Sequence, residues 1–238
     1  MIFVASPGRC GTKYLAKMLE VLPGVEARHE APPDFASCAY EAQADANIAA
    51  RFWRDKKLPA IRRSRAEVYV ETSHVFTNGF AEALVSLGVA FDVVFLLRMH
   101  RDVALSYWRR RSIPGRTERG RMYLARPDGD VCLQLRDWTQ LDDYQLCYWH
   151  CLETEARCGR LIWKFNGSTT YAMTMNRLVD GSGFRELVQE MGLPRPADWR
   201  GYEARREWVV NANPENYYRV WPEGELAELE AGVRDALT

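Results

Sequence analysis

The sequence lacks any long hydrophobic run, and this absence limits the classes of protein that it can encode. No segment approaches the roughly 18 consecutive apolar residues of a membrane-spanning helix, so no span is expected. The strand-like residues that begin at Ile2 leave no room for a signal peptide, which predicts a cytoplasmic protein. Internal repeats and low-complexity tracts are also missing. With 47% hydrophobic and 27% charged residues, the composition excludes a disordered or collagenous chain.

The sequence also has few groupings of metal ligands. Three cysteines, Cys147, Cys151 and Cys158, fall near one helical face with His150 at its margin, which raises the question of a metal site. No second ligand pair at zinc spacing follows, so we expect a buried helix face lined by small thiols and no bound metal. Without an export signal, free thiols are expected for all six cysteines, which include Cys10, Cys38 and Cys132.

Net charge is absent as well, but the charges are unevenly distributed. The chain has 32 basic and 32 acidic residues. Nine arginines lie between Arg98 and Arg126 against Asp102 and Glu118, whereas eight acids from Glu203 onward face four arginines. This asymmetry indicates either a surface that attracts an anionic ligand or an ordinary solvated surface.

Apolar runs and helical patterns alternate along the chain. Strands are predicted at 2–5, 68–70, 92–97 and 161–165, and helices at 12–22, 41–56, 81–87, 102–111, 141–157, 184–191 and 223–237. This order predicts an α/β fold, in which residues 1–238 form a single domain with a parallel β-sheet flanked by helices. Residues 112–130 are predicted to be a long mobile loop, and residues 192–222 an irregular segment.

The segment Ser6 to Leu15, SPGRCGTKYL, joins the first predicted strand to the first predicted helix. Such a turn places free backbone N–H groups at the positive end of a helix, where phosphate or sulfate fits. Gly8 and Gly11 permit unusual backbone angles, Arg9 and Lys13 add full charges, and Thr12 is a candidate cap or hydroxyl donor.

This turn does not satisfy the nucleoside triphosphatase pattern G-x-x-x-x-G-K-[ST]. After Gly11 come Thr12, Lys13 and Tyr14, so the lysine is one place late and the magnesium-binding hydroxyl is missing. The strand Asp92–Leu97 is followed by Arg98, where such enzymes place an acidic magnesium ligand. A metal-dependent ATPase is therefore not expected.

A second motif begins at that arginine. Arg98, Asp102 and Ser106 follow the spacing R-x-x-x-D-x-x-x-S-Y-W at the end of a predicted strand. A guanidinium and a serine hydroxyl two helical turns apart can bind one phosphate, and Asp102 is placed to cap the helix and orient an arginine. Because ligands bind at the carboxyl ends of parallel strands, the two motifs should meet if their strands are neighbours.

Together the two segments resemble the signatures of sulfotransferases that use 3′-phosphoadenosine 5′-phosphosulfate (PAPS). In that family a loop similar to P-R-S-G-T-T-x-L holds the 5′-phosphosulfate, and R-x-x-x-D-x-x-x-S-Y-Y holds the 3′-phosphate. The resemblance implies a P-loop nucleotide-hydrolase-like topology, PAPS as donor, adenosine 3′,5′-bisphosphate (PAP) as product, and no metal. It carries the following residues over as cofactor-binding: Pro7, Gly8, Arg9, Cys10, Gly11, Thr12, Lys13, Tyr14, Arg98 and Ser106.

The resemblance also supplies candidates for the catalytic base. The stretch Glu71-Thr72-Ser73-His74 is similar to the K-T-H-L stretch that carries the catalytic histidine of cytosolic members, although its lysine is not reproduced. Other branches use a glutamate, so His74, Glu71 and Glu30 are all candidates. Arg9 is expected to stabilise the leaving phosphate, and its removal to lower the rate at least about 100-fold, by analogy with the loss of an oxyanion donor.

The acceptor is left open by the sequence. The arginines at 109–126 suit an acidic glycan or peptide, whereas nearby aromatic residues suit a ring or sugar of a small molecule. A phosphoryl transferase on the same fold and a non-catalytic nucleotide- or RNA-binding protein are the alternative functions. No RNA-binding motif is visible, so no nucleic-acid partner is expected. The oligomeric state is open.

Overall fold

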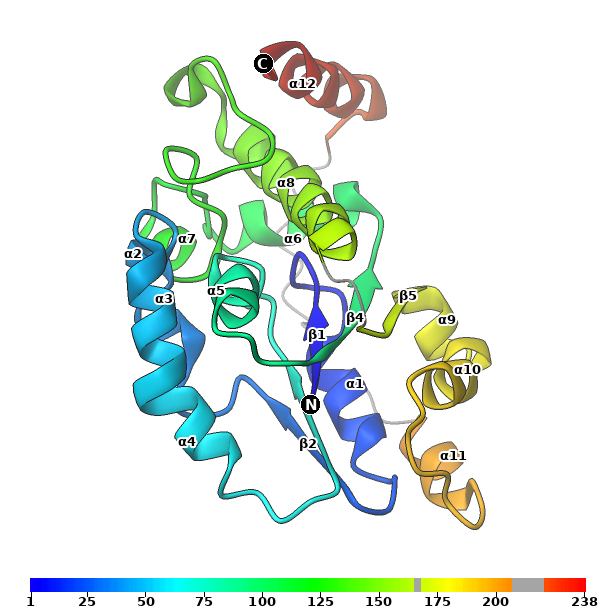
Figure 1. Ribbon diagram of the computed structural model, residues 1–238. Coiled ribbons are helices and arrows are strands. Elements are labelled where there is room, and N and C mark those ends of the chain that lie inside the picture. The colour runs from blue at the N-terminus through cyan, green and yellow to red at the C-terminus, as the bar shows by residue number, and fades with distance from the viewer. Residues whose placement is uncertain (165–167, 207–220) are drawn as a thin grey trace.

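The computed structural model describes residues 1–164, 168–206 and 221–238, and its centre is a five-stranded sheet (Figure 1). All strand pairs are parallel, and the spatial order is β2-β3-β1-β4-β5. The strands are β1 (Ile2–Ala5), β2 (Val25–His29), β3 (Val68–Thr72), β4 (Asp92–Leu97) and β5 (Thr170–Thr174). The predicted α/β class and parallel sheet are confirmed.

Helices connect the strands and continue beyond the last of them. The α-helices are α1 (Thr12–Leu19), α2 (Ala39–Ala42), α3 (Ala46–Phe52), α4 (Leu58–Ile61), α5 (Phe80–Ser86), α6 (His100–Arg109), α7 (Glu118–Tyr123), α8 (Asp143–Lys164), α9 (Met175–Val179), α10 (Ser182–Glu190), α11 (Arg200–Arg206) and α12 (Glu223–Ala236). Short 3₁₀ segments occupy η1 (Phe35–Ser37) and η3 (Trp138–Gln140), and η2 (Trp53–Lys57) is a π-helical turn.

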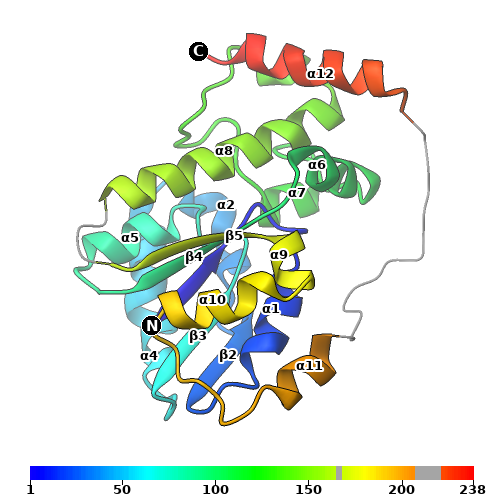
Figure 2. The same cartoon turned by 90° about the vertical axis from the view of Figure 1, so that its right-hand side faces the viewer.

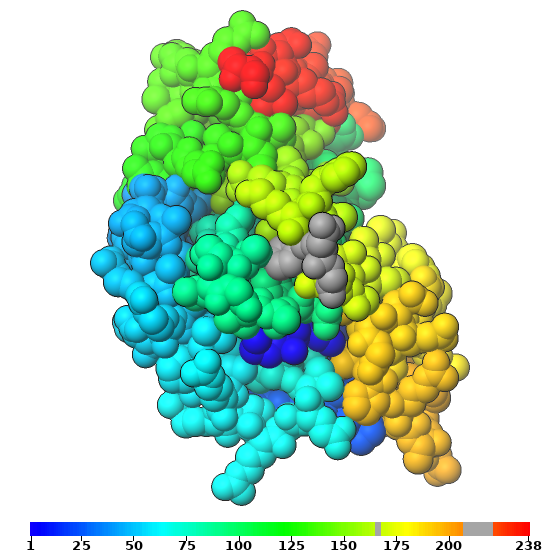
Figure 3. Space-filling model, viewed as in Figure 1, coloured from blue at the N-terminus to red at the C-terminus, as the bar shows by residue number. Residues whose placement is uncertain are grey.

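The strand β1 is buried on both faces because hydrophobic residues occupy every position. Ile2 and Val4 belong to one hydrophobic cluster with α1, α6 and α10, while Phe3 and Ala5 belong to another with α3 and α5. Figure 2 shows α5 on one side of the sheet and α1 and α10 on the other. The long helix α8 contributes residues to both clusters. Only a small patch of dark blue N-terminal residues reaches the face seen in Figure 3.

The predicted strand at 161–165 is wrong for the part that the structure describes. Residues 161–164 are the last turn of α8, whereas the fifth strand begins later, at Thr170. Trp163 is 89% exposed there, so the apolar letters of this turn do not mark a buried strand. The strand β2 was not predicted at all, and residue 165 lies outside the described residues.

The two predicted irregular segments contain helices. Residues 112–130 include α7, whose N-cap Thr117 accepts a hydrogen bond from the Gly120 N–H at 3.1 Å; the mobility of this segment stays a prediction. Residues 192–222 include α11, and 207–220 lie outside the described residues. The predicted helix at 41–56 is divided, because Asp45 caps a new helix through the Asn47 N–H at 2.9 Å. None of the helices described is long and apolar enough to cross a membrane.

Candidate functional site

The loop between β1 and α1 turns sharply through left-handed backbone conformations. Gly8, Arg9 and Gly11 have φ angles of 80°, 54° and 84°. Gly11 is the N-cap of α1, so Thr12 is the first helical residue and does not provide the predicted cap. The first turn of α1 therefore presents backbone N–H groups without helical acceptors at the carboxyl end of β1, as an anion site requires.

Two buried side chains hold this loop through a single carbonyl oxygen. The hydroxyl of Tyr107 on α6 donates to the Pro7 oxygen at 2.8 Å, and Nε2 of His150 on α8 lies 3.1 Å from the same oxygen. The Gly8 N–H donates in turn to the Ser6 hydroxyl at 2.8 Å. The loop is thus fixed to both helices that cover the sheet edge.

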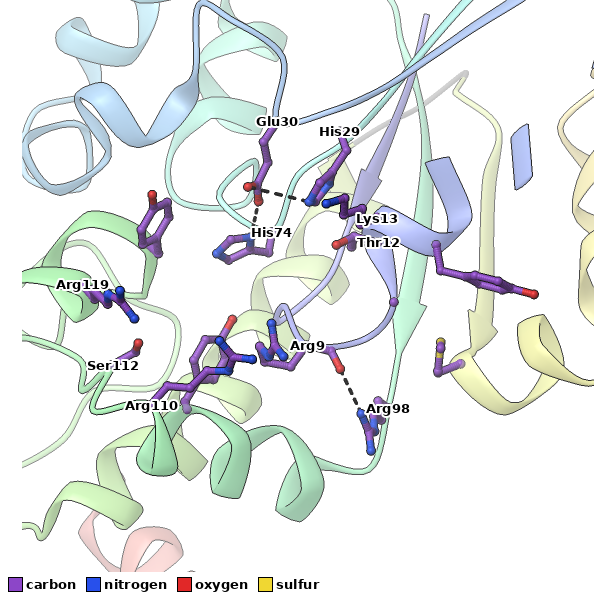
Figure 4. A pocket seen from close by; sticks show the side chains of 15 residues that line it. Arg9, Thr12, Lys13, His29, Glu30, His74, Arg98, Arg110, Ser112 and Arg119 are labelled. Carbon is purple, nitrogen blue, oxygen red and sulfur yellow. Dashed lines mark hydrogen bonds and ion pairs between the residues drawn. The ribbon is translucent and has the colours of Figure 1, made fainter. Parts of the chain in front are cut away.

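A cavity of about 400 Å³ opens beside the loop (Figure 4). It is lined by Arg9, Gly11, Thr12, Lys13, Tyr14, His29, Glu30, His74, Arg98, Tyr107, Arg110, Ser112, Arg119, Tyr123 and Met175. The two sequence motifs meet here, as predicted, because β1 and β4 are neighbouring strands.

Arg9 and Arg98 are linked directly. The Arg98 guanidinium donates from Nη1 to the backbone oxygen of Arg9 at 3.2 Å, and its Nε lies 3.3 Å from Asp102. Asp102 therefore orients an arginine, but it makes no capping bond in α6. Arg9 Nε donates to the Ser106 hydroxyl at 3.0 Å. Burial, and then the charge of Arg110, lower the pKa of Arg9. An anion in the cavity would relieve this repulsion.

Opposite the loop, two histidines flank one carboxylate (Figure 4). Nδ1 of His74 lies 2.6 Å from Oε1 of Glu30, and Nε2 of His29 lies 3.8 Å from Oε2. Burial alone would raise the pKa of Glu30, but the bond from His74 and the charges of both histidines outweigh it, so that the pKa is lowered. An ionised carboxylate only accepts, so this contact assigns a ring proton to Nδ1 of His74, and Nε2 is the ring nitrogen that does not contact Glu30.

Glu71 lies outside the cavity. Its side chain is 0% exposed, Lys57 Nζ donates to Oε1 at 2.6 Å, and the Tyr69 hydroxyl donates to Oε2 at 2.6 Å. The Ala31 N–H also donates to Oε1, at 3.2 Å. This placement argues against Glu71 as the base, because β3 points its side chain into the protein between the β2 turn and η2.

The structure brings most of the remaining predicted residues together. Eight of them line the cavity: Arg9, Gly11, Thr12, Lys13, Tyr14, Glu30, His74 and Arg98. Pro7, Gly8, Cys10 and Ser106 do not line it. The Cys10 thiol points to the Gly8 oxygen at 2.9 Å, and burial raises its pKa to about 12. Ser106 reaches the site through Arg9.

Sequence reasoning missed several lining residues. Arg110 and Arg119 belong to the basic stretch between Arg98 and Arg126, whose place in the fold the sequence does not predict. His29 directly precedes the predicted candidate Glu30. Each of these residues therefore carried a weak signal. Met175, which follows β5, carried none because that strand was not predicted. Tyr123 also carried no signal, because the helix α7 to which it belongs was not predicted.

The described residues contain no group of three His, Cys, Asp or Glu side chains arranged to hold a metal ion. The cysteines at 147, 151 and 158 are buried and free, as predicted. Burial raises the pKa of each of these thiols, so they are protonated in the helix.

A second cavity of about 550 Å³ adjoins the first. The two share Arg98 and Met175, and the second is further lined by the segment Leu97–Asp102, by Tyr148, Glu155 and Glu230, and by Thr174 and Asn176. It therefore extends the site along the ends of β4 and β5.

Comparisons with known proteins find similarity only in three dimensions: no protein-family model and no curated protein sequence matches the chain. The sulfotransferase domain from the curacin biosynthetic pathway is similar at a TM-score of 0.57 and 12% identity, over 83% of this chain and 75% of that one. The sulfotransferase domain of the Synechococcus PCC 7002 olefin synthase has a TM-score of 0.54 and 13% identity, over 98% and 86%. The chain therefore has the sulfotransferase fold.

Proposed function

We propose that this protein is a sulfotransferase that moves a sulfuryl group from PAPS to an acceptor hydroxyl or amine. The fold and the chemistry of the cavity support this proposal. Arg9, Lys13 and the free N–H groups at the start of α1 are donors and cations only, which suits the oxygens of a phosphosulfate. When bound, PAPS supplies an activated sulfuryl group on a phosphate leaving group.

The other end of the donor would lie toward Arg98. Its guanidinium suits a phosphate monoester, and its link to the Arg9 backbone ties the two anion-binding groups into one unit. The adjoining second cavity offers room for the nucleoside beside Met175, with Asn176 and Thr174 as polar partners. The Ser106 hydroxyl orients Arg9 by accepting from its Nε, and its own O–H is a donor for the 3′-phosphate in this proposal.

His74 is the base in this proposal, and Glu30 positions it. The carboxylate of Glu30 orients the ring through Nδ1, so Nε2 is the nitrogen that receives the acceptor proton. Glu30 has a φ angle of 48°, a left-handed conformation that costs a non-glycine residue on the order of 1–2 kcal/mol. Arg9 stabilises charge that develops on the leaving phosphate.

The single observation that carries the proposal is that the β1–α1 loop and Arg98 line one cavity. The direct test measures thermal stabilisation of the protein by PAP and by Mg-ATP, for the wild type and for Arg98→Ala. We expect PAP to raise the melting temperature more than Mg-ATP, and Arg98→Ala to remove most of that rise because it lacks the phosphate-binding guanidinium.

Arg63→Gln serves as the matched control, since Arg63 is exposed and does not line the cavity. Its PAP response should equal that of the wild type. Preference for Mg-ATP would instead favour a phosphoryl transferase, and stabilisation by neither nucleotide would contradict the proposed function.

A further inference from the structure

Two arginines of the cavity belong to neither donor motif. Arg110 follows α6, and Arg119 lies on α7; both line the cavity with Arg9. Within the described ranges, neither guanidinium has a carboxylate within ion-pair distance. Other arginines of the same basic stretch are paired: Arg116 with Asp143 at 2.7 Å, and Arg126 with Asp128 at 2.9 Å.

The charges that line the cavity do not cancel. Arg9, Lys13, Arg98, Arg110 and Arg119 are its cations, and Glu30 is the one carboxylate among the lining residues that the structure describes. A bound PAPS would offset the charges of Arg9, Lys13 and Arg98. Arg110 and Arg119 would then remain as two cations in a partly enclosed space, which favours a second anionic group.

These two arginines also lie on a different side of the site from the donor residues. In Figure 4, Arg110, Ser112 and Arg119 lie on one side of Arg9, whereas Lys13 and Arg98 lie on the other. His74 faces the space between the two groups. An acceptor that enters beside Arg110 and Arg119 would therefore reach the base without displacing the donor.

We infer that the acceptor is a small hydroxylated anion, whose carboxylate, phosphate or sulfate group is bound by Arg110 and Arg119; this rests on the proposed function. The acceptor oxygen forms the new bond to sulfur while the bond between sulfur and the donor phosphate oxygen breaks. The electron pair of that bond leaves with PAP, and the acceptor proton passes to Nε2 of His74. The volume of about 400 Å³ accommodates a ring-sized molecule beside a phosphosulfate.

The test compares three pairs of probes that differ in charge: 4-hydroxybenzoate and 4-hydroxybenzamide, glucuronate and glucose, and glycerol 3-phosphate and glycerol. Binding of each probe is measured by calorimetry on protein saturated with PAP. We expect at least one anion to bind about tenfold more tightly than its neutral partner, because hydrogen bonds to charged groups are the stronger ones. In the double variant Arg110→Gln/Arg119→Gln this preference should disappear.

Two further variants keep the test decisive. Arg119→Gln alone changes an exposed side chain and should reduce the preference even if the double variant does not fold. Arg63→Gln removes one positive charge that does not line the cavity and should retain the full preference. Equal binding of charged and neutral probes in all three pairs, or a preference that survives the double variant, would overturn the inference.

The PAP measurement separates the two proposals. If PAP stabilises the wild type and no anion is preferred, the acceptor inference is wrong and the proposed function stands. If PAP does not bind, the proposed function fails and the acceptor role fails with it. Binding of heparin or polyglutamate with no binding of the small anions would also overturn the inference, since it would indicate a macromolecular acceptor.

Discussion

Gly8 illustrates how single residues of the loop between β1 and α1 are constrained by their neighbours. Its φ angle is 80°, and a Cβ atom at this position would lie 1.9 Å from the Tyr107 hydroxyl oxygen and 3.1 Å from Cδ2 of His74. The Tyr107 hydroxyl cannot withdraw without breaking its bond to the Pro7 oxygen. Only glycine therefore fits between the loop and α6.

We predict that Gly8→Ala lowers the free energy of unfolding by about 1–3 kcal/mol more than Gly88→Ala. Gly88 also has a positive φ, 67°, but a Cβ atom there would meet nothing within 4 Å. Both variants lose stability because alanine disfavours the left-handed backbone conformation. Only Gly8→Ala also brings a Cβ atom into collision with the Tyr107 hydroxyl. Urea denaturation measures both losses. Equal losses for the two variants would show that the loop can accommodate a Cβ atom at Gly8, contrary to this structure.

At the residue scale, the sequence predicted the groups that belong to continuous motifs. Arg9 and Arg98 follow strands and Lys13 lies in the first turn of α1, so local structure places all three at the cavity, as expected. Glu71 and His74 are only three residues apart, yet the end of β3 sends one side chain into the protein and places the other at the cavity. Arg110 and Arg119 meet through the tertiary fold of α6 and α7, which no local pattern encodes.

At the scale of elements, a buried ion pair fixes the turn after β2 that carries Glu30. Lys57 of η2 is 1% exposed and donates to the backbone oxygens of Ala31 at 2.7 Å and Pro33 at 3.0 Å. The same ammonium binds Glu71, whose carboxylate receives the Ala31 N–H. Glu71 thus acts as a positioning residue for this turn.

We predict that Lys57→Met lowers the free energy of unfolding by about 3–5 kcal/mol, because it leaves the Glu71 carboxylate buried without its cation. The double variant Lys57→Met/Glu71→Gln should lose less than the single one, since the uncompensated charge is gone. Chemical denaturation of the three proteins provides the comparison. A double variant less stable than the single would contradict this account of the pair.

A buried histidine connects α8 to the loop between β1 and α1 and to the segment before α8. The Ala125 N–H donates to Nδ1 of His150 at 3.1 Å, and Nε2 lies 3.1 Å from the Pro7 oxygen. Only the neutral ring with its proton on Nε2 satisfies both neighbours. Burial lowers the pKa of His150 from 6.5 to about 3.

We predict that this histidine makes the stability fall in mild acid. Between pH 6.5 and about 3 the unfolded chain binds a proton at His150 that the folded protein does not, so the free energy of unfolding decreases as pH falls. The contribution to the slope is about half of 1.4 kcal/mol per pH unit at pH 6.5 and approaches that full value about one pH unit lower. In His150→Gln, whose amide can also accept and donate, the slope should be flatter by that amount. Unfolding at pH 7, 6 and 5 measures it, and parallel slopes would refute the assignment.

The sequence predicted the central strands and missed the edges, for a physical reason. The three interior strands β3, β1 and β4 are buried on both faces and read as apolar runs. The edge strands β2, VEARH, and β5, TYAMT, are largely half-buried or exposed, so their polar letters gave no strand signal. The opposite error occurs at the end of α8, where the apolar residues of 161–164 led to the prediction of a strand although they form the last helical turn.

At the scale of the whole molecule, an acidic C-terminal helix lies against part of the basic region. Arg101 of α6 pairs with Glu230 of α12 at 2.7 Å, and the Tyr144 hydroxyl of α8 donates to the same carboxylate at 2.7 Å. These contacts neutralise one part of the basic region away from the first cavity. The cations that line that cavity are left to bind a nucleotide and an anionic acceptor in the function that we propose.

The central claim is that one cavity binds both ends of an adenylate donor, and a crystal structure of the protein with PAP tests it most directly. The account predicts the 5′-phosphate within hydrogen-bond distance of the loop between β1 and α1, including Arg9. It also predicts the 3′-phosphate on the guanidinium of Arg98. PAP bound elsewhere, or bound with no phosphate on either arginine, would contradict it.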